Sequence, residues 1–260
     1  MAEKVLLIVV DGMRPDALLQ CGLPEIVDYV KKGTYSLHAR TVFPSITLPC
    51  HMSLFHSVVP DRHGVLTNIY VPQNHPIDGL VEVLASYRKK SAFFYMFEPL
   101  RDLSRPGKLS MSWFRAWDSY KWQGIDVKAA RACKEFILDE EPDLAFLYMG
   151  ETDEAGHKYG WMSPEYLSAI KEACECILDI SSAIPDNYTV IITADHGGHN
   201  RNHGETIPED MTIPICFRGK QFDVGRELSD ISIIDIAPTI TDVMGLEPGD
   251  DWEGHSILQS

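Results

Sequence analysis

The chain has 260 residues, of which 45% are hydrophobic and 23% are charged, a composition typical of a folded globular protein and unlike that of a disordered one. Its length suits one large α/β domain, so we expect residues 1–260 to form a single domain. The net charge of −15, without any run of lysine or arginine, argues against a protein that binds duplex nucleic acid.

The apolar run over 5–10 is too short for the core of a signal peptide or for a membrane span. The six cysteines are scattered along the chain without CxxC spacing, which favours neither a disulfide framework nor a cysteine zinc site. We therefore expect a cytoplasmic protein that does not associate with membranes.

Apolar runs alternate with segments of helical period along the chain, a pattern that predicts a mostly parallel sheet with helices on both faces. Strands are expected at 5–10, 91–96, 144–149, 189–193 and 213–218. Helices are expected at 24–32, after a cap at Asp78, at 51–56, at 126–138, from Ser163 and Pro164, and after a cap at Asp235. The irregular segment 97–124 is rich in tryptophan and arginine, so it is either a cap that lines a substrate pocket or a surface loop anchored by its tryptophans.

Acidic side chains follow three of the expected strands. Asp11 comes directly after 5–10, Asp153 lies shortly after 144–149, and Asp195 follows 189–193 together with His196. Ligands of open parallel sheets bind beyond the carboxyl ends of the strands, so we expect these three aspartates to converge. Buried carboxylates that converge must be neutralised, and bound metal ions are the simplest means.

Histidines accompany these acids at spacings that suit a metal site. His157 lies four residues after Asp153, so one helical turn or a tight loop can aim both side chains at one ion. The glycine-rich loop after His196 adds His199 and His203, of which we favour His203 as a ligand and rank His199 second.

Thr47 stands between two prolines, just before the expected short helix at 51–56. The backbone N–H groups and the dipole at a helix N-terminus favour an anionic oxygen there. A free hydroxyl is a poor nucleophile near neutral pH, but coordination to a dication makes it reactive. Thr47 is therefore either a simple helix cap or, if metal is present, a nucleophile.

Five segments in order along the chain complete the pattern: VVDGMRPD at 9–16, FPSITLP at 43–49, HGV at 63–65, DEAGH at 153–157 and TADHG at 193–197. Together they resemble the alkaline phosphatase superfamily, and most of all its nucleotide pyrophosphatase/phosphodiesterase branch. The resemblance extends over nearly the whole chain. It implies one catalytic domain with the three-layer α/β fold of alkaline phosphatase.

The resemblance also implies a site for two divalent ions, which are zinc in the family, with Mn²⁺ as the alternative. In that family the threonine attacks phosphorus to form a covalent phosphothreonine, which a metal-bound water then hydrolyses, and the two ions lie roughly 4 Å apart. Two dications and three aspartates give a formal charge of +4 − 3 = +1, which suits a phosphate oxyanion. The implied ligands of one ion are Asp11, Thr47, Asp195 and His196, and those of the other are Asp153, His157 and His203.

The substrate is expected to be a small phosphate ester or a nucleotide. The family usually has an asparagine three residues after the nucleophile, where this chain has Cys50, a weak hydrogen-bond donor. We take Cys50, Asn68 and Tyr70 as candidate substrate contacts, and the aromatic residues of 113–120 favour a diester or a nucleotide through ring stacking. A phosphomonoesterase or a phosphonate hydrolase on the same site is the alternative, and a catalytically dead metal-binding module is a third interpretation.

Overall fold

A seven-stranded sheet with the order β2-β7-β6-β1-β5-β3-β4 forms the centre of the protein, which is described here from a computed structural model covering residues 3–69, 71–73, 76–116 and 123–259. Among the described residues, β7 pairs antiparallel with β2 and with β6, and the other strand pairs are parallel, so the sheet is mostly parallel, as expected. The strands are β1 (Lys4–Val10), β2 (Thr34–Arg40), β3 (Ser91–Tyr95), β4 (Met111–Phe114), β5 (Leu144–Met149), β6 (Tyr188–Thr193) and β7 (Thr212–Arg218).

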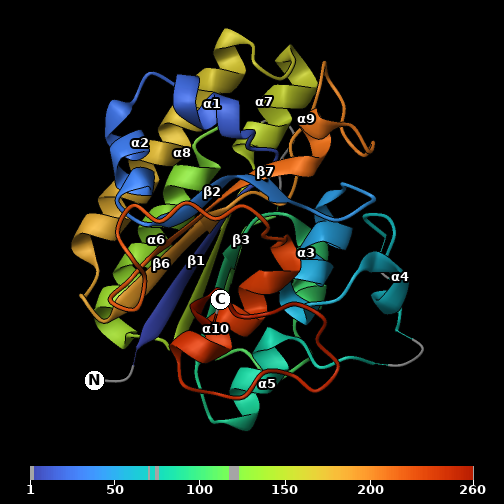
Figure 1. The fold of residues 1–260 in the computed structure, drawn as a ribbon, viewed down its shortest axis with the longest axis vertical. Helices are drawn as coiled ribbons and strands as arrows, with labels where there is room; N and C mark the ends of the chain where they lie inside the picture. Colours follow the sequence, from blue (N-terminus) through green and yellow to red (C-terminus); the bar gives the residue numbers. More distant parts are fainter. Residues whose placement is uncertain (1–2, 70, 74–75, 117–122, 260) are drawn as a thin grey trace.

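Helices cover both faces of this sheet, as Figure 1 shows. On one face, α8 contacts each of its neighbours α1, α2, α6 and α7. On the other face, α3 contacts α4, α5 and α10. The helices are α1 (Pro15–Gln20), α2 (Pro24–Lys31), α3 (Thr47–His56), α4 (Pro60–His63), α5 (Leu80–Ser86), α6 (Ile125–Glu140), α7 (Glu151–Tyr159), α8 (Pro164–Ala183), α9 (Pro208–Met211) and α10 (Ile236–Val243), with 3-10 helices at Glu98–Leu103, Ile233–Asp235 and Ile257–Gln259. The fold is therefore the expected three-layer α/β sandwich.

The three central strands are apolar on both faces because helices cover both sides of the sheet. All of β5 and β6 is buried, and so is β1 after its first residue. Their register pairs Val10 with Met149 and Val9 with Thr193. The three strands thus end at the same edge of the sheet, and the residues that follow them start from neighbouring positions.

The five expected strands are β1, β3, β5, β6 and β7, each shifted by no more than one residue at either end. The strands β2 and β4 were not expected, because both lie at the edges of the sheet and alternate buried or half-buried residues with more exposed ones. The segment 97–124 is accordingly less irregular than expected, since it contributes a 3-10 helix and the strand β4.

Helix starts agree with the sequence at some positions and differ at others. The Ser163 hydroxyl caps α8 by accepting a hydrogen bond from Tyr166 N. The prediction for Asp78 was wrong: Gly79 precedes α5, and Asp78 pairs instead with Arg105 at 2.6 Å. The helix expected at 51–56 begins earlier, at Thr47, because Pro49 still lies in the first turn, where a proline is tolerated.

Across the described residues, every helix is too short or too polar to cross a lipid bilayer.

Candidate active site

The central strands deliver their acidic residues to one edge of the sheet. Asp11 follows β1 directly, and Asp195 follows β6 with one residue between them. Gly12 N donates a hydrogen bond of 3.1 Å to Asp195 Oδ1, which ties the two strand ends together. Asp153 reaches the same place from α7, which begins two residues after β5 ends. The three aspartates therefore converge, as the parallel sheet predicts.

The N-terminus of α7 is held by a reciprocal pair of side chains that we call the Asp126–Glu151 clasp. Asp126 Oδ1 accepts from Gly150 N and its Oδ2 accepts from Glu151 N, both at 3.0 Å. In return, Glu151 Oε1 accepts from Asp126 N at 3.0 Å. These bonds satisfy N–H groups that a helix end leaves without partners, so they fix where α7 starts.

Helix α7 explains the spacing of Asp153 and His157. Residues four apart lie on one face of a helix, and here His157 Nε2 is 3.3 Å from Asp153 Oδ2. This hydrogen bond raises the pKa of His157 to about 9. Burial favours a higher pKa for Asp153, but the hydrogen bond to His157 and the nearby histidines outweigh it and lower that pKa.

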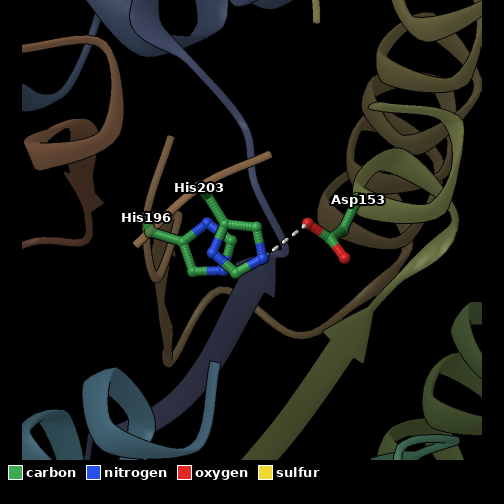
Figure 2. A group of neighbouring side chains, drawn as sticks. All are labelled: Asp153, His196 and His203. Atoms are coloured by element: carbon green, nitrogen blue, oxygen red, sulfur yellow. Dashed lines mark ion pairs between the residues drawn. The ribbon is translucent and has the colours of Figure 1, made fainter. Parts of the chain in front are cut away.

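Two further histidines stack on each other beside Asp153 (Figure 2). The ring centroids of His196 and His203 are 3.8 Å apart and their planes differ by 15°. His203 Nε2 is 3.7 Å from Asp153 Oδ1, while His196 Nε2 lies 3.2 Å from Asp11 Oδ1 and 3.5 Å from Asp195 Oδ2. His196 therefore stands between the strand-end aspartates and Asp153.

The three histidines His157, His196 and His203 each direct their Nδ1 atom at a backbone carbonyl oxygen. A carbonyl only accepts, so Nδ1 carries the hydrogen in each ring. Burial lowers the pKa of His196 and of His203, so these two rings are neutral and their Nε2 atoms present a lone pair toward the aspartates, whereas His157 presents one once it has lost the proton that it donates to Asp153. The distances are 3.0 Å from His157 to Arg201 O, 2.7 Å from His196 to Gly197 O and 2.8 Å from His203 to Ser45 O. Metal-ligating histidines are typically oriented in this way by their second nitrogen.

The three aspartates carry buried oxygens that lack partners. Among the described residues, Asp11 Oδ1, Asp153 Oδ1 and Asp195 Oδ2 are buried oxygens without a hydrogen-bond partner. Burial, followed by repulsion from Asp195 and Asp153, raises the pKa of Asp11, and burial also raises that of Asp195. Lone pairs that face lone pairs in a buried space require a cation, so the donor set fits metal ions.

Two groups of donors meet the geometric requirement for an ion. In each group the ligand atoms all lie within 4.8 Å of one another. The strand-end group contains Asp11, Asp195 and His196, and the helix-side group contains Asp153, His196 and His203, with His157 next to Asp153. Carboxylate and imidazole donors of this kind suit zinc, with manganese as the alternative.

His199 lies away from both groups. Its Nδ1 is 2.8 Å from Asp210 Oδ1, and its Nε2 faces Glu205 at 3.7 Å. The buried Asp210 also accepts a hydrogen bond from Glu205 N, so it organises the loop that carries His203. The structure thus brings His203 to the site. His199 lies outside it and pairs with Asp210, which organises the loop.

Thr47 is the first residue of α3, and its hydroxyl points at the strand-end group. Thr47 Oγ1 lies 3.5 Å from both Asp11 Oδ2 and His196 Nε2. The N-terminal dipole of this ten-residue helix favours negative charge at the same point. Thr47 is therefore placed where an ion in the strand-end group and an anionic substrate would meet.

A cavity of about 470 Å³ opens in front of Thr47. Of the candidate substrate contacts, Asn68 lines this cavity and accepts a hydrogen bond from Leu48 N at 2.9 Å through its Oδ1. Tyr70 lies outside the described residues. The cavity is lined by Asp11, Thr47, Asn68, Met96, Phe97, Glu98, Pro99, Phe114, Ala116, Tyr148, Gly150, Asp153, Glu154, His157 and His203.

The structure contradicts the interpretation of Cys50 as a substrate contact. Its side chain is fully buried behind the first turn of α3, and Thr41 Oγ1 donates to its sulfur at 3.3 Å. Cys50 Sγ in turn faces the carbonyl oxygens of Val42 and Pro44. A thiol held in this way has no surface to offer to a phosphate oxygen.

Several residues that support the site were not found from the sequence. The Tyr148 hydroxyl donates to Asp11 Oδ2, and the Thr152 hydroxyl donates to Asp11 O. Trp161 Nε1 donates to Gly12 O at 2.9 Å. The one available signal was Tyr148, a phenol near the end of an otherwise apolar strand.

Comparison with known proteins adds an independent line of support. Residues 5–79 and 85–207 match the model of the type I phosphodiesterase/nucleotide pyrophosphatase family. The chain is 24% identical over 269 residues to a bis(5'-adenosyl)-triphosphatase of Mus musculus, with 91% of this chain and 53% of that protein covered. It is 23% identical to ectonucleotide pyrophosphatase/phosphodiesterase family member 7 of Homo sapiens, over 85% of this chain and 54% of that protein. The chain thus spans about half the length of these curated relatives.

The fold is shared with a solved structure of murine ectonucleotide pyrophosphatase/phosphodiesterase 5, an inactive threonine-to-alanine variant in complex with AMP. The TM-score is 0.77 at 15% identity, with 96% of this chain and 98% of that chain covered. The matched segments 5–79 and 85–207 include Asp11, Thr47, Asp153 and the metal-ligand candidates up to His203. The chain belongs to the type I phosphodiesterase/nucleotide pyrophosphatase family.

Proposed function

We propose that the protein is a metal-dependent hydrolase of phosphoric esters, of phosphodiesterase/nucleotide pyrophosphatase type, with Thr47 as its nucleophile. The observation that carries this proposal is the position of the Thr47 hydroxyl, 3.5 Å from Asp11 Oδ2, beside a cluster of buried carboxylate oxygens without partners. Family membership supports the same class of reaction.

The ligand assignment follows the two groups of donors. Asp11, Asp195 and His196, together with Thr47, would hold one ion, and the other ion would be held by Asp153, His157 and His203. When bound, the two ions supply the positive charge that activates the threonine hydroxyl and stabilises the phosphoryl oxygens.

Side chains of the cavity supply the nucleophile and a hydrogen-bond donor for the phosphate. Thr47 Oγ loses its proton to water as it forms a bond to phosphorus, the bond between phosphorus and the ester oxygen breaks, and that oxygen leaves as an alcohol after taking up a proton from water. Asn68 uses its Oδ1 atom for Leu48 N, which directs the amide nitrogen of its side chain away from that contact and makes it a donor for a phosphate oxygen. Water then cleaves the bond between phosphorus and Thr47, which regenerates the hydroxyl.

The apolar part of the cavity lining favours a diester over a monoester. Met96, Phe97, Pro99 and Phe114 form this part, and no lysine or arginine is among the described residues that line the cavity. A monoester dianion needs additional cationic donors, whereas the second substituent of a diester needs an apolar or aromatic surface. The AMP bound by the murine relative is consistent with a substituent of nucleoside size.

The test is a comparison of substrates on the zinc-loaded protein. We expect bis(p-nitrophenyl) phosphate to be hydrolysed faster than p-nitrophenyl phosphate and than a phosphonate ester, and a dinucleotide to be cleaved at its phosphodiester linkage. Thr47→Ala should remove most turnover, on the order of a thousandfold or more. The control variant Thr67→Ala, at an exposed position nearby, should keep the turnover of the wild type. Near wild-type hydrolysis by the Thr47 variant would refute the assigned role, and faster hydrolysis of the monoester or the phosphonate would move the assignment to that alternative.

Metal content separates an enzyme from a catalytically dead module. We expect about two zinc ions per chain after purification without chelators, and a chain that binds none would support the module.

We also propose a cytoplasmic location. All six cysteines are free thiols in the structure, which is the usual state of cysteines in a reducing compartment.

A further inference from the structure

A second cavity lies at the edge of the sheet opposite to the candidate active site. It has a volume of about 370 Å³ and is bounded by the ends of α2 and α8, the start of β6 and the loop that follows β7. Asp195 follows the carboxyl end of β6, so the two cavities lie at opposite ends of this strand. Among the residues that the structure describes, they share no lining residue. The second cavity is therefore a separate pocket, and its size suits a small molecule.

Cationic residues are concentrated at this cavity although the chain as a whole is acidic. Lys32, Arg218 and Lys220 line it, and Asp186 is the one acidic residue among the described residues that do so. The formal charge of the lining is thus +3 − 1 = +2, in a chain whose net charge is −15. None of the three cations forms an ion pair within 4.0 Å with any described residue. The cavity therefore attracts a small anion to a surface that elsewhere repels it.

Arg218 is held in one orientation by its contact with Tyr29. Its guanidinium carbon lies 4.2 Å from the centre of the Tyr29 ring, and its Nη1 atom donates to Tyr29 O at 3.2 Å. Within the described part of the chain this is the one hydrogen bond of the guanidinium, whose other N–H groups are left for a ligand. A guanidinium pairs with phosphate through two parallel N–H groups, so Arg218 offers a preformed contact for a phosphate group.

Aromatic rings form another part of the lining. Tyr29 and Tyr188 come from different elements, and Phe222 lies between the cavity and the buried Phe217, on which its ring stacks with the centroids 5.2 Å apart. Such rings pack favourably against another aromatic group. The cavity thus combines cations for a phosphate with an aromatic surface for a ring.

We infer that this cavity is a second, non-catalytic binding site for a phosphate monoester that carries an aromatic ring, of the nucleoside monophosphate class. The dianionic phosphate matches the formal charge of the lining, and the ring packs on the aromatic residues. The inference does not rest on the proposed function, since none of the residues that carry it lies near Thr47.

Calorimetry with AMP on zinc-loaded Thr47→Ala tests this inference, because that variant should hold AMP at the metal site without turning it over. We expect two AMP molecules per chain. Lys220→Gln or Lys32→Gln in this background, both at exposed positions, should weaken one of the two binding events by about fivefold and leave the other unchanged. Lys31→Gln is the matched control: it removes the same charge one residue from Lys32 but outside the cavity lining, and should change neither event.

Two further ligands test the chemical class. At the event that Lys220→Gln weakens, AMP should bind at least about tenfold more tightly than ribose 5-phosphate, and adenosine should not bind. Equal binding of AMP and ribose 5-phosphate would overturn the aromatic part of the inference. Equal effects of Lys31→Gln and Lys32→Gln would overturn the cavity as the site.

Crystals of zinc-loaded Thr47→Ala grown with 8-bromo-AMP locate each bound molecule through the anomalous signal of bromine. We expect one peak beside the metal ligands and one in the second cavity. A peak beside the metal ligands alone would overturn the inference and leave the proposed function standing. A peak in the second cavity alone would support the inference and count against the proposed function, and the absence of both peaks would count against both.

Discussion

The two groups of metal donors are built from different parts of the fold. The strand-end group, Asp11, Asp195 and His196, has side chains that are at most 2% exposed and follow adjacent central strands. In the helix-side group, Asp153 is 13% exposed and the adjoining His157 is 38% exposed, and its members come from α7 and a loop. The register of the sheet fixes the first group, whereas the second depends on how α7 and the loop pack.

The strand-end group is the rigid part of the site, and the helix-side group is the adjustable part. Neighbouring parallel strands hold Asp11 and Asp195 through several paired residues, so one altered side chain does not move them. The position of Asp153 depends on the Asp126–Glu151 clasp, and that of His203 on the contact with Ser45 O. We expect the ion of the strand-end group to be bound more tightly than that of the helix-side group.

The largest expected effect comes from removing an aspartate of either group. Asp153→Ala should lower the zinc content from about two ions to about one and reduce kcat/KM by at least about a hundredfold, because one half of the two-ion site is lost. Asp195→Ala should cost as much activity and should also lower the zinc affinity of the remaining site, since His196 belongs to both groups. Metal analysis and kinetics on both variants give the comparison, and unchanged metal content in Asp153→Ala would show that the helix-side group is misassigned.

A smaller effect is expected from the Asp126–Glu151 clasp, which touches no predicted ligand directly. Asp126→Ala removes both acceptors at the N-terminus of α7, so zinc affinity at the helix-side group should fall by about tenfold while the strand-end group keeps its ion. Zinc titration by calorimetry separates the two binding steps. Asp139→Ala, at an exposed position on the same helix as Asp126, is the control and should change neither step. Equal weakening of both sites would mean that the clasp stabilises the fold as a whole.

The smallest effect concerns a buried histidine outside both groups. Burial lowers the pKa of His56 to about 4, below its unfolded value of 6.5, so the unfolded state takes up the proton first as the pH falls. The stability that depends on neutral His56 is full above pH 6.5 and is lost as the pH falls toward 4. As the pH falls from 7.5 to 5, protonation of His56 in the unfolded state should lower the free energy of unfolding by about 2 kcal/mol.

Urea unfolding of the metal-free protein measures this loss. His56→Asn keeps a donor for Met52 O, and its free energy of unfolding should decline less steeply with falling pH than that of the wild type. His38→Asn, at an exposed position, should follow the wild type. Identical slopes for wild type and His56→Asn would show that this histidine is protonated in the folded protein as readily as in the unfolded chain.

The sequence predicts the centre of the fold better than its edges. Strands such as β1 and β6 are buried on both faces, so they read as continuous apolar runs, and the acidic residue after each run marks the functional edge. The edge strands β2 and β4 carry no such signal, because β2 is only partly buried and the residues of β4 alternate between half-buried and exposed. Parallel pairing then brings Asp11 and Asp195 together although 184 positions separate them.

Contacts between distant side chains were beyond prediction from the sequence. The hydrogen bond from Tyr148 to Asp11 spans 137 positions, and nothing in either local segment indicates it. Cys50 shows the opposite case. Its position three residues after Thr47 suggested a contact with the substrate, and its burial rules this contact out.

The central claim is that the strand-end group and the helix-side group each bind a metal ion next to Thr47. Anomalous diffraction at the zinc absorption edge, on crystals grown with zinc, tests it most directly. We predict two separate peaks, one among Asp11, Asp195 and His196 and the other beside Asp153 and His203. Zinc bound elsewhere, with no peak at either group, would contradict the claim.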